Sequence, residues 1–203
     1  MSSVRVATRE LVRERILAAA IELASTTEWN SIRMVDIAER AGVSRRTVFN
    51  EFESKSGVLE AMAWHNTSRY LEGVAARLAE HRDDPVAAVT AVTEFVLTTI
   101  AADPLAHAVL DAPPGTPDDL LALATTRSAP FIEAATQLNI AFAQQHWSRL
   151  IRADADVPFV AESLVRLLFS HMIRPSGPPA RIARSFGQLV QALLTTSDSP
   201  PTE

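Results

Sequence analysis

The chain has 203 residues, of which 47% are hydrophobic and 21% charged, as in globular rather than disordered proteins. It contains no cysteine, which excludes disulfides and thiol nucleophiles, and its five histidines show no paired spacing suited to a metal. The net charge of −5 argues against a protein coated by nucleic acid, yet residues 1–50 hold eight arginines against six acidic residues.

Targeting and membrane segments are not indicated. No apolar run follows the basic residues of the N-terminus, and none reaches transmembrane length. We therefore expect a cytoplasmic protein with no membrane partner.

Residues 4–27 are expected to form a long helix. Apolar residues recur at helical spacing, and the arginines lie off that stripe. Arg5, Arg9 and Arg13 could reach along a DNA backbone, or neighbouring glutamates could balance them at an ordinary surface.

Two short helices joined by a tight turn are expected next, over residues 35–53. Ile37, Ala38 and Ala41 form the inner face of the first helix. Gly42 ends this helix because glycine adopts the left-handed conformation without a Cβ clash. Ser44 follows as the N-cap of the second helix.

The second of these helices presents two distinct faces. Val48 and Phe52, four residues apart, face the first helix, while the outer side carries arginines and an amide at Arg45, Arg46, Thr47 and Asn50. Two short helices with this turn and these side chains indicate a helix-turn-helix.

This stretch and its flanks resemble the TetR family of one-component transcriptional regulators. The resemblance covers roughly residues 9 to 62 and rests on Arg15-Ile16-Leu17-x-Ala19-Ala20, Asp36-Ile37-Ala38, Ala41-Gly42-Val43-Ser44, Thr47-Val48-Phe49, Phe52 and Ser54-Lys55. It implies an all-α homodimer with an N-terminal DNA-binding domain and a larger domain that binds a small effector. The chain departs from the family pattern at Glu28-Trp29 (usually Gly), Arg33 (usually a small hydroxyl residue) and Phe49 (usually Tyr).

The predicted recognition helix offers several DNA contacts. At least one of Arg45 and Arg46 is expected to bond guanine O6 and N7, a contact worth about 1–3 kcal/mol of discrimination, and the other could hold phosphate. Thr47 can contact thymine or phosphate, and Asn50 can pair with adenine or end the helix. Phe49 is an apolar contact or, by preference, a core residue. Glu51 is unexpected at such a surface and could accept from cytosine or repel the backbone.

Phosphate contacts are predicted at two further helix starts. Arg33 opens the helix before the turn and could hold phosphate, or it could be solvated near Glu28 or Asp36. Lys55, the only lysine, stands just inside a helix capped by Ser54 and is expected to bind phosphate. The predicted DNA-binding residues are Arg33, Ser44, Arg45, Arg46, Thr47, Phe49, Asn50 and Lys55.

The rest of the chain is expected to be helical as well. Caps that precede prolines, and an absence of alternating β patterns, predict helices near residues 56–82, 85–101, 104–111, 117–127, 130–152, 157–174 and 179–196. The fold class is therefore all-α: a three-helix DNA-binding head followed by a helical bundle. We expect a DNA-binding domain at 1–53, a ligand-binding and dimerisation domain at 54–196, and a disordered tail at 197–203.

Two functions are expected of the helical bundle. Aromatic and polar side chains could enclose a small, largely apolar effector, or could simply form core: Phe95, Thr99, Phe131, Asn139, Phe142, Trp147, Phe169 and Met172. The last two helices are more apolar than surface helices need to be, with Leu164, Leu168, Leu189, Leu193 and Leu194. This indicates burial against a partner subunit, which the family resemblance also implies.

The sequence therefore predicts a homodimeric, ligand-responsive repressor that an effector releases from a pseudo-palindromic DNA operator. The alternative is a small-molecule-binding helical module whose DNA-binding head is weakened or vestigial, supported by Phe49 and Glu51. An enzyme is not expected, since no nucleophile–base spacing, carboxylate dyad or phosphate-binding loop stands out, and no cofactor or metal is indicated.

Overall fold

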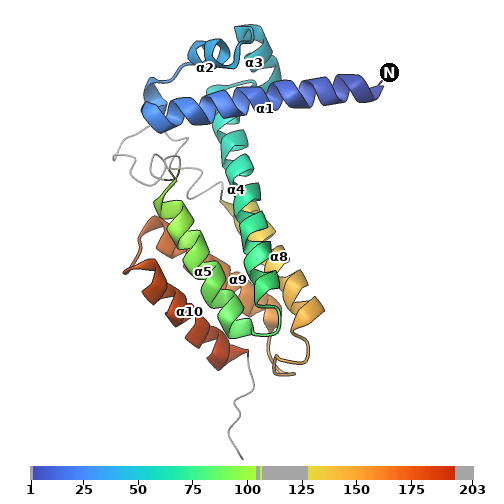
Figure 1. The fold of residues 1–203 in the computed structure, drawn as a ribbon, viewed down its shortest axis with the longest axis vertical. Coiled ribbons are helices and arrows are strands. Elements are labelled where there is room, and N and C mark those ends of the chain that lie inside the picture. Colours follow the sequence, from blue (N-terminus) through green and yellow to red (C-terminus); the bar gives the residue numbers. More distant parts are fainter. Residues whose placement is uncertain (1, 104–105, 107–127, 195–203) are drawn as a thin grey trace, which may run out of the picture. The chain divides into compact units, whose positions relative to one another are not determined.

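A computed structural model describes residues 2–103, 106 and 128–194, and every element within these residues is a helix (Figure 1). The elements are α1 (Ser2–Thr26), the 3₁₀ turn η1 (Trp29–Ser31), α2 (Met34–Ala41), α3 (Arg45–Phe52), α4 (Lys55–Glu80), α5 (Pro85–Ala101), α8 (Ala129–His146), α9 (Val157–Ile173) and α10 (Pro179–Leu193). The all-α fold class is confirmed. The helices predicted near 104–111 and 117–127, and the predicted tail, lie outside the described residues.

The described residues fall into two compact units. The first contains residues 2–67, 103 and 106, and the second contains residues 68–102 and 128–194, so α4 contributes to both. None of the described helices is long and apolar enough to cross a membrane.

Fully buried side chains from four helices form the core of the first unit. They come from α1, α2, α3 and the start of α4: Ile16, Ala20, Ile37, Val48 and Leu59. The apolar stripe predicted for α1 is confirmed at its centre, where Ile16, Ala19 and Ala20 are buried. Burying each large aliphatic side chain stabilises the unit by about 1.5–3 kcal/mol, so this core fixes how α2 and α3 are held.

The turn between α2 and α3 has the predicted backbone. Gly42 lies in the left-handed region at φ +64°, and its N–H bonds to the carbonyls of Ala38 and Glu39. A Cβ at Gly42 would stand 3.2 Å from Arg15 Nη2, which donates a hydrogen bond to the Ala41 carbonyl at 2.7 Å. The backbone conformation therefore favours glycine here, whereas a Cβ would need only a small shift of the Arg15 side chain.

In the second unit, two helices begin at acidic N-caps followed by proline, as predicted. The Asp84 carboxylate accepts from the Ala87 N–H at 2.9 Å, and the Asp156 carboxylate accepts from the Phe159 N–H at 3.1 Å. Each bond satisfies a backbone donor that the first turn of a helix otherwise leaves unpaired.

The helix predicted over 130–152 ends earlier, at His146. Trp147 is buried, and its indole N–H donates to the Arg82 carbonyl at 2.8 Å. The Trp147 carbonyl accepts from the N–H of Leu150 at 2.9 Å, a bond that closes a turn after the end of the helix. Helical periodicity in the sequence could not reveal the contact between Trp147 and Arg82, which are far apart along the chain.

Helices α5 and α10 approach each other closely. A Cβ at Gly187 of α10 would lie 2.4 Å from Thr90 Oγ1 of α5, so only glycine permits this spacing. Leu97, Ile182 and Phe186 are buried along the same contact. Helix α9 joins this pair through Leu164 and Leu168, while α8 packs mainly on α9.

We expect Gly42→Ala to lower the free energy of unfolding of the first unit by about 1–2 kcal/mol, because a non-glycine residue is forced into the left-handed conformation. Urea denaturation followed by circular dichroism would measure the loss. Gly177→Ala is the control: its Cβ would make only an ordinary contact, 3.6 Å from Arg181 Cδ. Equal stability of the two variants would contradict the prediction.

Candidate nucleic-acid interface

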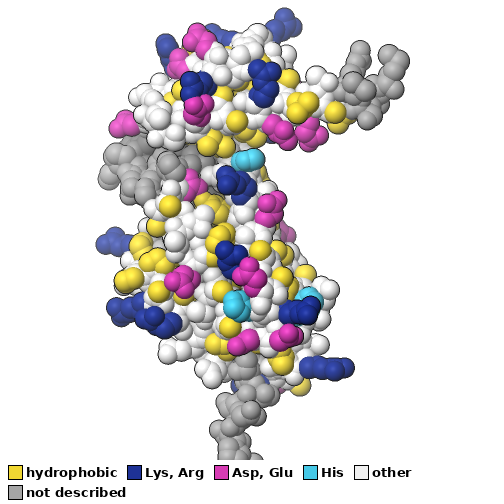
Figure 2. All heavy atoms as spheres, viewed as in Figure 1, with side chains coloured by type: hydrophobic (Ala, Val, Ile, Leu, Met, Phe, Trp, Pro, Cys, Tyr) yellow, Lys and Arg dark blue, Asp and Glu magenta, His cyan; other side chains and the backbone are white. Residues whose placement is uncertain are grey.

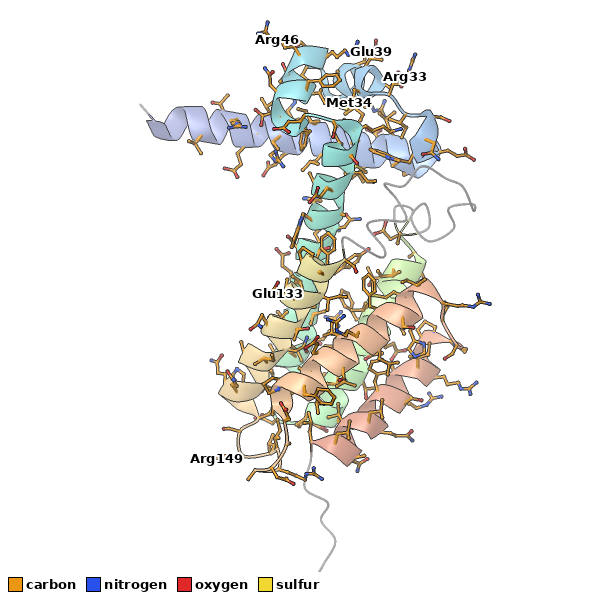
Figure 3. The ribbon with its side chains drawn as sticks, turned by 180° about the vertical axis from the view of Figure 1, so that it is seen from behind. Arg33, Met34, Glu39, Arg46, Glu133 and Arg149 are labelled. Carbon is orange, nitrogen blue, oxygen red and sulfur yellow. The ribbon has the colours of Figure 1, made fainter. Side chains whose placement is uncertain are left out.

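Helix α3 has one buried side and one exposed side. Val48 and Phe52 are buried as predicted, while Arg45, Arg46 and Asn50 are exposed. The Arg46 side chain extends outward from the head in Figure 3. Cationic and amide side chains are thus presented together on one exposed face of an eight-residue helix.

The start of α3 is fixed by two hydroxyl side chains. Ser44 Oγ accepts from the Thr47 N–H at 3.1 Å, which confirms Ser44 as the N-cap. The Ser44 and Thr47 hydroxyls are also hydrogen-bonded to each other at 2.8 Å. Both hydroxyls therefore lie at the positive end of the helix dipole, where an anion such as phosphate is favoured.

The preference for Phe49 as a core residue is wrong. Its side chain is 36% exposed, and the Arg45 guanidinium lies 5.2 Å from the centre of its ring. The ring and the guanidinium therefore form a cation–π pair on the outer side of α3. The physical reason is the register of α3, in which Val48 and Phe52 already occupy the inner face.

Glu51 is turned towards α1 and away from the outer face of α3. Both of its carboxylate oxygens accept from Arg9 Nε at 2.9 Å, and its carbonyl accepts from Arg13 Nη1 at 3.0 Å. The Arg13 guanidinium also lies over the Phe52 ring, 4.4 Å from its centre. Sequence reasoning balanced Arg9 and Arg13 with local glutamates and missed these partners, which are about forty residues away along the chain.

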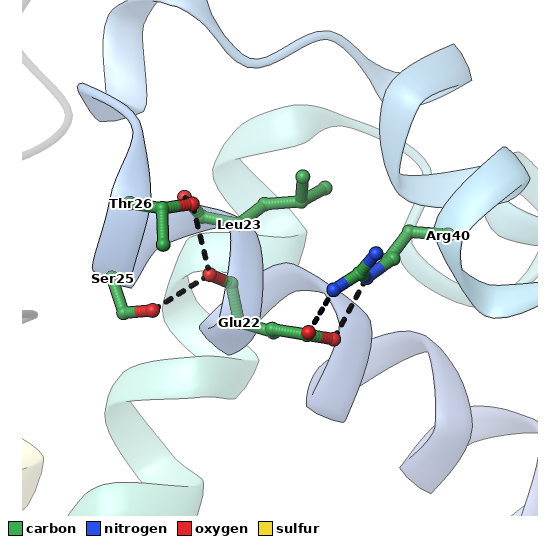
Figure 4. Close-up of polar contacts among 5 residues, drawn as sticks. All are labelled: Glu22, Leu23, Ser25, Thr26 and Arg40. Atoms are coloured by element: carbon green, nitrogen blue, oxygen red, sulfur yellow. Dashed lines mark hydrogen bonds and ion pairs between the residues drawn. The ribbon is translucent and has the colours of Figure 1, made fainter.

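A further ion pair connects α1 to α2. Arg40 Nε donates to Glu22 at 2.8 Å, and Arg40 Nη2 pairs with the other carboxylate oxygen (Figure 4). The Glu22 carbonyl accepts from the Ser25 hydroxyl at 2.7 Å. Exposed pairs of this kind are worth little individually, about 0–1 kcal/mol. Their positions nevertheless show which arginines of the head are already engaged.

Arg33 is the N-cap residue of α2 and is paired with Asp36. Arg33 Nε and Nη2 donate to the Asp36 carboxylate at 3.2 and 3.0 Å, and the Arg33 backbone N–H donates at 2.7 Å. The side-chain hydrogen bonds, followed by the backbone one, hold the pKa of Asp36 below its ordinary value. The side-chain hydrogen bonds, followed by the negative charge of Asp36, raise the pKa of Arg33. The guanidinium remains at the surface (Figure 3), so a phosphate contact stays a prediction.

Lys55 has a structural role that the sequence did not reveal. Its ammonium donates to the carbonyls of Trp29 and Asn30, at 2.6 and 3.2 Å, and lies 5.0 Å from the centre of a Trp29 ring. Lys55 therefore holds η1 against the start of α4. The predicted phosphate contact is neither supported nor removed by these bonds.

The second unit contains a cavity of about 50 Å³ among α5, α8, α9 and α10. Two of the predicted ligand-binding residues, Asn139 and Trp147, line it. Most other lining side chains are aliphatic, and they include Val92, Leu164 and Leu168. Sequence reasoning did not select Val92, and it assigned Leu164 and Leu168 to the dimer interface, because aliphatic side chains at helical spacing look the same whether they face a cavity, a core or a partner.

The remaining predicted ligand-binding residues do not line this cavity, and these are Phe95, Thr99, Phe131, Phe142, Phe169 and Met172. Phe95 packs on α4, where a Cβ at Gly73 would lie 2.2 Å from its ring, and Arg77 stacks over it at 5.0 Å. The Thr99 hydroxyl donates to the Phe95 carbonyl at 2.7 Å. Their involvement with an effector stays untested.

Large apolar side chains remain exposed on α9 and α10, and these include Phe159 (67%), Leu167, Ile173, Leu189 and Leu193 (44%). Hydrophobic side chains are visible at the surface over α5 and α10 in Figure 2. Of the leucines predicted to face a partner, Leu194 is instead buried within the unit, and Leu164 and Leu168 pack against its core.

Family comparisons match both units. Residues 16–62 match the model for bacterial regulatory proteins of the tetR family, and residues 84–192 match the model for the bacterial tetracyclin repressor, C-terminal domain. The chain is 33% identical over 187 residues to the HTH-type transcriptional regulator AlkX of Mycobacterium tuberculosis (strain ATCC 25618 / H37Rv), covering 91% of this chain and 85% of that protein. The chain belongs to the TetR family.

Solved structures of TetR-family proteins share the fold. The TetR family repressor AlkX from Dietzia sp. strain DQ12-45-1b, implicated in biodegradation of n-alkanes, gives a TM-score of 0.72 at 24% identity, covering 89% of this chain and 98% of that one. FadR of Thermus thermophilus, solved with lauroyl-CoA, gives 0.67 at 21% identity, covering 94% and 99%.

TetR-family regulators bind operator DNA through the helix-turn-helix, bind small effectors through the C-terminal domain, and are dimeric. This chain is accordingly a TetR-family transcriptional regulator with a ligand-binding C-terminal domain.

The Arg33–Asp36 pair makes the first unit sensitive to acid. Because the pKa of Asp36 is lower in the folded chain than in the unfolded chain, its carboxylate stabilises the fold above the unfolded pKa of about 3.9. That stabilisation is lost as the pH falls through the lower, folded pKa. We expect Arg33→Ala to raise the Asp36 pKa towards its ordinary value, as followed by a carboxyl NMR titration.

Arg149→Ala is the control for this titration, because it removes an exposed arginine of the second unit and should leave Asp36 unchanged. An Asp36 pKa that stays the same in Arg33→Ala would show that Arg33 does not stabilise the carboxylate.

Proposed function

We propose that this TetR-family protein is a homodimeric repressor that reads a pseudo-palindromic operator with the outer face of α3 and leaves it when an apolar effector binds. The main support is the exposure of Arg45, Arg46 and Asn50 on a helix whose opposite side is anchored by buried Val48 and Phe52. An anchored helix can present its side chains to the major groove in one defined orientation. The two-fold symmetry of the dimer would be mirrored in the operator.

The proposed DNA contacts divide into base and phosphate contacts. Arg46 extends into solvent and would bond guanine O6 and N7, and Asn50 would pair with adenine. Arg45 is stacked on Phe49, which would hold its guanidinium ready for a base or a phosphate. Phosphate contacts are proposed for the helix-start residues Arg33, Ser44, Thr47 and Lys55.

This proposal assigns DNA binding to residues 1–53 and effector binding and dimerisation to residues 54–196. The exposed apolar side chains of α9 and α10 support a dimer interface through these two helices, because such side chains gain about 25 cal/mol for each Å² removed from water. Two subunits would then form a four-helix interface.

The cavity among α5, α8, α9 and α10 supports a small, largely apolar effector. The two solved relatives point in the same direction, since one is implicated in n-alkane biodegradation and the other holds lauroyl-CoA. We therefore propose that the effector of this protein contains an aliphatic segment, by extension from these two relatives. Effector binding would lower operator affinity only if the two conformational states bind the effector differently.

The vestigial-head alternative loses one of its two sequence arguments. The Glu51 carboxylate is paired with Arg9 and faces α1, so it does not oppose DNA from the outer side of α3. Phe49 alone remains, and its stacking with Arg45 is compatible with DNA binding.

The DNA contact of Arg46 can be tested on duplexes selected from a random pool with the purified protein. We expect an inverted repeat to be enriched, and Arg46→Ala to weaken binding to it by about 10- to 100-fold and relax preference at one position of each half-site. Arg149→Ala is the control, because it removes one positive charge from the surface of the second unit and should leave the affinity for the selected duplex unchanged. No enriched sequence, or equal affinity for random DNA, would contradict operator binding.

The proposed dimer interface predicts that Leu193→Arg converts the protein to a monomer, because it buries a charge in an apolar interface. Leu193 is already 44% exposed, so the subunit itself should still fold. Sedimentation would report the mass. Leu150→Arg is the control, since Leu150 is comparably exposed but lies outside α9 and α10. A dimeric Leu193→Arg variant would place the interface elsewhere.

A further inference from the structure

Arg45 and Phe49 lie four residues apart on the exposed side of α3, so their side chains share one strip of the helix surface. The Arg45 guanidinium carbon is 5.2 Å from the centre of the Phe49 ring, and 36% of Phe49 is exposed. Arg46 and Asn50, also four apart, form a second strip beside the first. One strip of α3 therefore presents a cation together with an apolar ring, and the other presents a cation together with an amide.

Stacking on the ring leaves the hydrogen-bonding capacity of Arg45 intact. A cation–π contact uses the flat face of the guanidinium, whereas its five N–H donors lie in the guanidinium plane. The ring therefore restricts the orientation of Arg45 without taking the donors that guanine O6 and N7 require. Arg9 and Arg13 differ in this respect, because their donors are bonded to Glu51.

The Phe49 side chain carries no polar atom, so it cannot donate a hydrogen bond to a phosphate as a tyrosine would. Among the groups that base edges display in the major groove, the C5-methyl of thymine is the apolar one. Neighbouring base pairs are about 3.4 Å apart along the DNA axis, and the helical twist also displaces them sideways. Two groups separated as Arg45 and Phe49 are can therefore contact neighbouring base pairs.

We propose that Arg45 and Phe49 act as one unit that reads two neighbouring base pairs: Arg45 bonds guanine O6 and N7, and the Phe49 ring contacts the methyl group of the adjacent thymine. This inference rests on the proposed operator binding by α3 and adds two base identities to each half-site. Phe49 determines specificity twice, because its ring contacts one base and holds the guanidinium that reads the other. Without the ring, Arg45 is free to turn towards phosphate, a contact that carries no sequence information.

The test starts from the duplex that the native protein selects from a random pool, with affinities measured by fluorescence anisotropy. The relevant guanine is the one whose preference is lost in Arg45→Ala. Two modified duplexes each lose one group in one half-site: deoxyuridine replaces the adjacent thymine and lacks only its methyl group, and 7-deazaguanine replaces the guanine and lacks only its N7 acceptor. We expect the native protein to bind the first about 4-fold more weakly, as for one buried methyl group, and the second about 10-fold more weakly.

Phe49→Ala separates the paired reading from independent contacts. It should lose the deoxyuridine effect and reduce the 7-deazaguanine effect to about 2-fold, although the guanine contact belongs to Arg45. Leu150→Ala is the matched control, because Leu150 is exposed to nearly the same extent as Phe49, 37% against 36%, but belongs to the second unit. It should keep both effects. Thermal melts followed by circular dichroism check that each variant is folded.

Three results would overturn this inference while leaving operator binding in place. They are a selected inverted repeat in which no thymine adjoins the guanine, native protein that binds the deoxyuridine duplex as tightly as the unmodified one, and a full 7-deazaguanine effect in Phe49→Ala. Failure to enrich any sequence would overturn the proposed operator binding together with this inference, so the two kinds of failure are distinguishable.

Discussion

The structure of the proposed DNA-reading surface depends on the burial of one side of α3. Val48 and Phe52 are inserted into the core of the first unit, and Arg13 covers the Phe52 ring while bonding to the Glu51 carbonyl. These contacts fix the rotation of α3 about its own axis. Residues three or four apart share one face of a helix. Since Val48 and Phe52 occupy the buried face, Arg46 and Asn50, which are also four apart, face outward.

The features predicted correctly from the sequence are those set by near neighbours along the chain. Gly42 and the caps at Ser44, Asp84 and Asp156 each depend on groups within four residues, so their chemistry can be recognised locally. The partners of Glu51 and Lys55 could not be predicted in this way. Arg9 is 42 residues from Glu51, and Trp29 is 26 residues from Lys55, so only the packing of the folded unit brings them together.

The candidate effector cavity was predicted only in part for a related reason. Helical periodicity shows which residues share a face, and two of the residues it indicated, Asn139 and Trp147, line the cavity. It does not show which neighbouring helix that face meets. Phe95 belongs to the same helix as Thr93, yet it packs on α4 whereas Thr93 lines the cavity.

The contact of Gly73 with Phe95 has a mechanical consequence for the second unit. The aromatic ring occupies the space of the missing side chain and rests directly on the backbone of α4, with Arg77 stacked on it one turn further along. The Phe95 ring therefore opposes rotation or sliding of α4 against α5, because either motion would have to displace the ring from the Gly73 backbone. Within the second unit, this close contact therefore couples residues 68–80 of α4 to the Phe95 segment of α5.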